Sequence, residues 1–120
     1  MQLEVRTRLQ HVVDAGEAIL RFTAGKSFED YHRDEMMRAA VERMFTIVGE
    51  ALREAARVSP SIRHDLPDYR VIVDFRNVIV HDYATVYDEG VWRIIANHLP
   101  LLLSEVRALL APSPSGQNPA

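Results

Sequence analysis

Apolar residues recur every three or four positions through most of the chain, which is the spacing of one buried face of an α-helix. A first helix is predicted from Leu3 to Ala24, and Gly25 offers a C-terminal stop directly after it. A stripe on one face needs a partner that covers it, so the pattern indicates packing of helix on helix. The stripe consists of Val5, Leu9, Val12, Gly16 and Ile19.

A second, longer helix is predicted to follow. It begins at Ser27-Phe-Glu-Asp30, which resembles a capping box, and Ser59-Pro60 ends it. Gly49 inside this helix costs about 1 kcal/mol relative to Ala, which predicts that another helix approaches closely at that point. The apolar stripe steps alternately by four and three residues through Met37, Val41, Met44, Val48, Ala51 and Ala55.

The third helix, from Asp68 to about Val80, competes with a strand because most of its apolar residues are β-branched. A lone strand among long helices would have no sheet to join, so the context favours a helix. The fourth helix spans about Asp88 to Leu110, and Pro100 should kink it because proline has no N–H for the carbonyl of Ala96. Its stripe is Val91, Ile95, Leu99, Leu102, Val106 and Leu109.

Length and composition fit one small all-α domain over residues 1–111, followed by a disordered tail at 112–120 that has nothing apolar to bury. The chain of 120 residues contains no cysteine, which excludes disulfides, thiol catalysis and thiolate zinc sites. Neither a metal nor a cofactor is expected. The start lacks a basic region before an apolar run, and no apolar stretch approaches the ~20 residues of a membrane span, so a cytoplasmic protein is the default expectation.

A net charge of −3 counts against a domain that coats nucleic acid nonspecifically. All basic residues except Lys26 are arginines, whose planar guanidinium can hold a phosphate with two hydrogen bonds. If RNA binds, a local arginine patch must bind it. The candidate residues are Arg63 and Arg70 together with Arg76, and Arg38 and Arg43 are further contributors.

Residues 76–83, Arg-Asn-Val-Ile-Val-His-Asp-Tyr, bring a guanidinium, an amide, an imidazole and a phenol into one short, otherwise apolar stretch. Arginine binds phosphate through a fixed charge, and histidine gives or takes a proton near neutral pH, so together they suit phosphodiester chemistry without a metal. On a continuous helix Arg76 and His81 point about 140° apart. Either the helix ends or distorts near His81, or a second copy of the chain completes the site across a two-fold axis.

The spacing of Arg76, His81 and Tyr83, with Asn77 beside the arginine, resembles the Arg-x4-His-x-Tyr motif of the HEPN superfamily in its HepT branch. The helix at 38–51, a proline-bearing loop, the segment at 74–83 and a tryptophan-containing helix follow in the same order. The resemblance therefore covers roughly residues 38–110. It implies an up-and-down four-helix bundle that forms a homodimer and acts as a metal-independent RNase toxin.

The resemblance also implies roles for single residues. Arg76 and His81 match the catalytic pair, and Asn77 matches the polar neighbour of the arginine. Tyr83 matches the phenol onto which a MntA-like minimal nucleotidyltransferase, the antitoxin, transfers AMP.

These residues also have purely structural interpretations. Arg76 could pair with Asp74 or Asp82, and Tyr83 could be a core aromatic with its hydroxyl at the surface. Asp82 either orients His81 or caps a turn. Two other functions also stay open. One is a catalytically silent module that presents Tyr83 to a nucleotidyltransferase, and the other is an accessory subunit that adds a nucleotide-binding surface to that enzyme.

Overall fold

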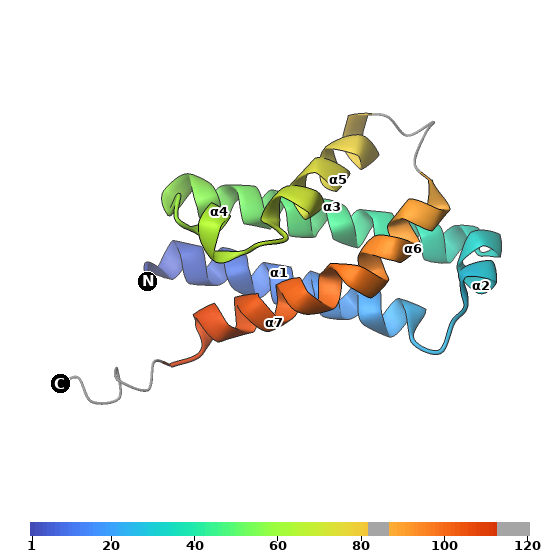
Figure 1. Ribbon diagram of the computed structural model, residues 1–120, viewed down its shortest axis with the longest axis horizontal. Coiled ribbons are helices and arrows are strands. Elements are labelled where there is room, and N and C mark those ends of the chain that lie inside the picture. Colours follow the sequence, from blue (N-terminus) through green and yellow to red (C-terminus); the bar gives the residue numbers. More distant parts are fainter. Residues whose placement is uncertain (82–86, 113–120) are drawn as a thin grey trace.

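The computed structural model describes residues 1–81 and 87–112, which fold into seven α-helices without a strand (Figure 1). Two long helices, α1 (Leu3–Thr23) and α3 (Glu35–Val58), pack along each other in opposite directions. On this pair, α5 (Tyr69–His81) packs against α3, and α7 (Leu99–Leu110) packs against α1. The all-α prediction is confirmed, whereas the up-and-down four-helix bundle and the dimer stay predictions.

The second predicted helix is in fact two helices, α2 (Phe28–Arg33) and α3. The predicted capping box opens α2: the Ser27 hydroxyl accepts a hydrogen bond from the Asp30 N–H at 3.1 Å, and the Asp30 carboxylate accepts one from the Ser27 N–H at 2.9 Å. Asp34 interrupts the helix because its backbone is extended and its carboxylate accepts from the Met37 N–H at 3.0 Å. An aspartate that caps the next turn competes with continuation of the helix, so a single long helix was the wrong prediction.

The last predicted helix is also divided, into α6 (Asp88–Asn97) and α7, with His98 between them. Pro100 lies in the first turn of α7. Backbone N–H groups in this turn have no acceptor within the helix, so the missing N–H of proline costs no hydrogen bond there. The helix is thus interrupted at the single residue His98, two positions before the proline that predicted a kink. A short helix that the pattern did not predict, α4 (Ile62–Asp65), lies in the connection between α3 and α5.

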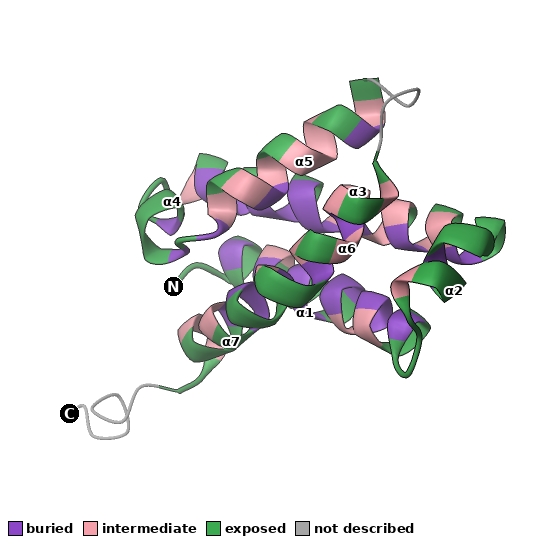
Figure 2. Ribbon diagram, turned by 45° about the vertical axis from the view of Figure 1, so that its right-hand side comes forward, coloured by how far each residue is buried: buried purple, intermediate pink, exposed green. Residues whose placement is uncertain are grey.

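The predicted stripes form the core, as the buried segments between the helices in Figure 2 show. All predicted positions of α1 are buried, and only Met44 in the second stripe and Leu109 in the last are partly exposed. In α5, Ile72 and Ile79 are buried, and the ring of Phe75 meets that of Phe45 edge to face at 5.2 Å. This contact with α3 explains why the β-branched segment is a helix here: Ile72 and Ile79 are buried on a helical face, and there is no sheet in the described residues.

Residues 113–120, most of the predicted tail, lie outside the described residues. Among the helices that the structure describes, none combines the length and the apolar content that a membrane-spanning segment requires.

Candidate functional site

Arg76 lies in the middle of α5, where this helix comes closest to α3. The contact point on α3 is Gly49: a Cβ atom added there would lie 2.4 Å from the Cβ and 2.5 Å from the Cγ of Arg76. Carbon atoms in contact are normally about 3.5–4.0 Å apart, so no larger residue fits without movement of a helix. The close approach predicted at Gly49 is confirmed, and the group that approaches is the arginine of the motif.

The guanidinium of Arg76 is held from two sides, and its side chain is only 13% exposed. One terminal nitrogen donates to the Glu50 carboxylate at 3.2 Å, and the other donates to the Asn77 side-chain oxygen at 3.1 Å. The Nε atom is buried without a hydrogen-bond partner in the described residues. Of the two alternative partners, Asp74 is not bonded to the arginine, since Glu50 from α3 takes that place, and Asp82 lies outside the described residues. The Asn77 side chain is the second hydrogen-bond partner of the arginine, and its role at the motif stays a prediction.

His81 is the last residue of α5 and is exposed. Residues 82–86 lie outside the described residues, so the predicted end or distortion of the helix near His81 stays a prediction. The residues from Arg76 to His81 are nevertheless continuously helical, so the two side chains stay about 140° apart. His81 is not among the residues that line the cavity beside Arg76. Asp82 and Tyr83 lie outside the described residues.

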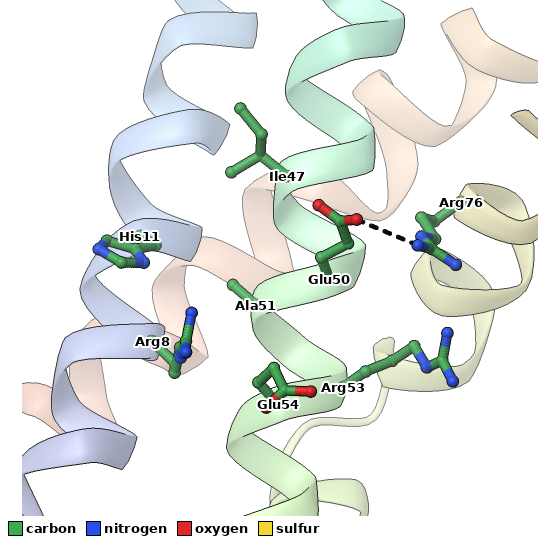
Figure 3. Close-up of a pocket in the computed structure, with 8 residues that line it drawn as sticks. All are labelled: Arg8, His11, Ile47, Glu50, Ala51, Arg53, Glu54 and Arg76. Carbon is green, nitrogen blue, oxygen red and sulfur yellow. Dashed lines mark hydrogen bonds and ion pairs between the residues drawn. The ribbon is translucent and has the colours of Figure 1, made fainter. Parts of the chain in front are cut away.

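A cavity of about 400 Å³ opens beside Arg76 and extends across α3 to α1 (Figure 3). Arg8 and His11 of α1 form one wall, and Arg53 of α3 and Arg76 form the other. Ile47, Glu50, Ala51 and Glu54 of α3 complete the lining. Sequence analysis missed Arg8, His11 and Arg53, although the three-residue step from Arg8 to His11 places them on one helical face.

Two of the arginines predicted to bind RNA, Arg63 and Arg70, line one cavity of about 420 Å³ at the junction of α4 and α5, whereas Arg76 lines the cavity between α1 and α3. Arg43 is exposed on α3. The binding of RNA by these residues stays a prediction.

Arg38 belongs to a polar cluster where α2, α3 and α6 meet. Its Nε lies 4.0 Å from the Asp88 carboxylate, and the His32 ring nitrogen lies 2.7 Å from the same carboxylate. Burial raises the pKa of the nearby Glu42 carboxyl, and the negative charge of Asp88 raises it further. Burial likewise raises the pKa of the Tyr31 phenol. Arg38 thus pairs with the first residue of α6, and its contact with RNA stays a prediction.

The described residues contain no group of three or more histidine, aspartate or glutamate side chains placed around a common point. His11, His32 and His64 are exposed, while the half-buried His98 bonds to the Asp68 carboxylate at 2.8 Å. The chemistry available around Arg76 is therefore that of guanidinium, imidazole and carboxylate groups.

Comparison with known proteins shows which family the chain resembles. The family described as "Ribonuclease HepT-like" matches residues 13–109, which include Arg76, His81 and all of the cavity except Arg8 and His11. No solved structure matches the chain significantly.

Several curated proteins are similar over nearly their full length. Among those named "Putative RNase", one from Caldanaerobacter subterraneus is 27% identical over 88% of this chain and 93% of its own, and one from Methanocaldococcus jannaschii is 25% identical over 86% of this chain and 94% of its own. A "Probable ribonuclease HepT" from Thermococcus cleftensis is 27% identical over 84% of this chain and 91% of its own.

Proposed function

The chain belongs to the HepT-like ribonuclease family, and we propose that it is a metal-independent endoribonuclease that acts as the toxin of a toxin–antitoxin module. The observation that carries the proposal is the position of the Arg76 side chain. A buried, fixed guanidinium at the family's motif, beside an open cavity, is what electrostatic stabilisation of a phosphoryl transition state requires.

The proposed reaction uses the 2′-hydroxyl of RNA as the nucleophile. The 2′-oxygen bonds to the neighbouring phosphorus, the bond from phosphorus to the 5′-oxygen breaks, and a 2′,3′-cyclic phosphate remains. His81 accepts the proton of the 2′-hydroxyl or donates one to the leaving 5′-oxygen. Arg76 stabilises the negative charge that builds on the phosphorane oxygens. DNA lacks the nucleophile and should not be cleaved.

A homodimer is part of this proposal. His81 projects about 140° away from Arg76 on the same continuous helix, so one copy does not direct both groups at one phosphate. A two-fold axis near α5 would bring His81 of one copy to Arg76 of the other, because an isologous interface repeats every contact in both directions. The exposure of His81 and of Val78, which is 40% exposed on the same helix, supports such an interface.

Control of the toxin is assigned to Tyr83 and to a MntA-like minimal nucleotidyltransferase as antitoxin. The phenol oxygen of Tyr83 attacks the α-phosphate of ATP, pyrophosphate leaves, and the tyrosine carries AMP. The added phosphodiester would compete with RNA for Arg76 as its counter-ion. Asp82 is assigned the role of orienting His81. The support for these roles is the position of both residues directly after His81 in the motif.

A second candidate is a non-catalytic subunit that accompanies a nucleotidyltransferase. The observation in its favour is that both terminal nitrogens of Arg76 already have protein partners, Glu50 and Asn77. In that case the arginine would serve to hold α5 against α3.

Cleavage of a labelled RNA by the purified protein tests the two candidates. The toxin should produce 2′,3′-cyclic phosphate ends that mass spectrometry identifies, EDTA should not affect the rate, and the matching DNA should stay intact. His81→Ala should lower the rate ~10²-fold or more, since it removes the proton carrier. A folded His81→Ala protein with the wild-type rate would contradict the assigned mechanism, and wild-type protein without cleavage would favour the accessory subunit.

A further inference from the structure

We infer that the cavity between α1, α3 and α5 is a subsite for the nucleotides next to the cleaved phosphate, in which Arg8 and Arg53 bind backbone phosphates. The inference rests on the proposed function, because it takes Arg76 as the residue beside the cleaved phosphate. It adds two residues outside the motif to the substrate site, and Arg8 lies outside the segment that matches the family.

The charges in the cavity favour an anion at its two walls. Glu50 is neutralised by Arg76, and Glu54 pairs with Arg57 at 3.1 Å. Arg8 and Arg53, in contrast, have no ion-pair partner among the described residues. A phosphate that binds either guanidinium can form two charge-assisted hydrogen bonds and displaces no protein carboxylate. The free positive charge therefore lies on opposite walls, next to α1 and next to α5 (Figure 3).

The floor of the cavity suits the other parts of a nucleotide. Ile47 is half-buried and Ala51 is buried, so they offer an apolar surface between the two arginines. The exposed ring of His11 adds a flat face on which a base can stack. A volume of about 400 Å³ lies within the range of roughly 300–1,000 Å³ that is usual for small-ligand sites. Stacking needs an unpaired base, so the inference is specific for single-stranded RNA.

The position of the cavity relative to Arg76 determines the order in which a bound RNA strand would contact the arginines. Arg76 is nearly buried and ends at the edge of the cavity, whereas Arg53 lies one turn from Glu50 on α3. A strand that places a phosphate at Arg76 can continue past Arg53 and across α3 toward Arg8. Arg8 and Arg53 should therefore govern substrate binding and leave the chemical step to the motif.

Fluorescence anisotropy with a short, labelled single-stranded RNA tests the subsite in the His81→Ala background, where the probe stays intact. Each removed phosphate contact should lower the slope of log affinity against log salt by about 0.7 for a single strand. At ~0.1 M salt this corresponds to about a fivefold loss of affinity for Arg8→Ala and again for Arg53→Ala. With His81 restored, both variants should raise KM and leave kcat near the wild-type value.

Arg21→Ala is the matched control, since it removes the same charge from the same helix as Arg8. Arg21 is exposed and lies about 20 Å from Arg8 along the axis of α1, far from the cavity. The Arg21→Ala variant should bind the RNA with the same affinity, and with the same slope of log affinity against log salt, as the His81→Ala parent protein. Equal losses in all three variants would reveal a general charge effect and overturn the subsite.

Two further outcomes separate this inference from others. If cleavage depends on His81 but Arg8→Ala and Arg53→Ala bind RNA like the control, the subsite is refuted while the proposed function stands. If light scattering shows that these variants dissociate a dimer while each chain binds RNA as before, the cavity is a contact between copies and the inference fails. Absence of cleavage by the wild-type protein would overturn the proposed function and with it the position of the subsite next to a cleaved phosphate, whereas the anisotropy, which needs no cleavage, would still decide whether Arg8 and Arg53 bind single-stranded RNA.

Discussion

Replacement of Gly49 by alanine is the most direct test of how α3 positions the side chain of Arg76. Two effects oppose each other. Alanine favours the helix by about 1 kcal/mol over glycine. Its Cβ, however, would lie 2.4 Å and 2.5 Å from the Cβ and Cγ of Arg76, roughly 1 Å closer than carbon atoms tolerate. These atoms are fixed near the backbone of α5, so relief requires that α5 move and not merely that a side chain rotate.

The size of both effects can be estimated. Overpacking of a filled contact costs about 1–3 kcal/mol, so the net change in unfolding free energy is about zero to 2 kcal/mol of destabilisation. A domain of this size should lose up to roughly 10 °C in Tm. The larger effect is expected on cleavage, because a 1 Å misplacement of a group that stabilises the transition state can cost about 10²-fold in rate.

Gly90→Ala is the control, since Gly90 also lies in a helix, α6, and its added Cβ would meet nothing closer than Tyr87 Cβ at 3.9 Å. This variant should gain stability and keep the wild-type cleavage rate. Calorimetry and an assay with a fluorogenic RNA measure both quantities on the same preparations. If Gly49→Ala unfolds at the temperature of Gly90→Ala and cleaves RNA at the wild-type rate, then Gly49 does not position Arg76.

Three further predictions concern other parts of the chain. Asp34→Ala removes the cap from the Met37 N–H and should lower the stability by about 1 kcal/mol, which thermal unfolding measures. Because burial raises the pKa of Glu42 in the folded state above 4.5, its ionisation opposes folding as pH rises; Glu42→Gln should raise the Tm at pH 7, and the gain should vanish below pH 4.5. An unchanged difference across this range would contradict the assigned cause. Tyr83→Phe should still cleave RNA but resist the nucleotidyltransferase, and an AMP-sized mass increment that persists in this variant would place the modification elsewhere.

The sequence by itself determined the helical nature of the fold and the residues that face the core. Buried faces repeat with the helical period, so Leu9, Val41 and Leu102 could be assigned to the interior without any coordinates. Gly49 was informative for the same reason, since a glycine costs stability in a helix unless a close contact requires it. The chemistry of Arg76 and His81 singled out their segment, and the resemblance to the family motif assigned them the catalytic pair.

The tertiary structure decided which charges meet, because residues far apart in sequence come together only after the helices pack. Glu50 pairs with Arg76 across the contact between α3 and α5, in place of the sequence neighbour Asp74 that local spacing suggested. Arg8 and Arg53 face the same cavity although 44 positions separate them in the chain, and no periodicity records that relation. The break at Asp34 likewise depended on one hydrogen bond, from the Met37 N–H to the Asp34 carboxylate. This bond competes with the backbone bonds of a continuous helix, and the hydrophobic pattern does not encode which of them forms.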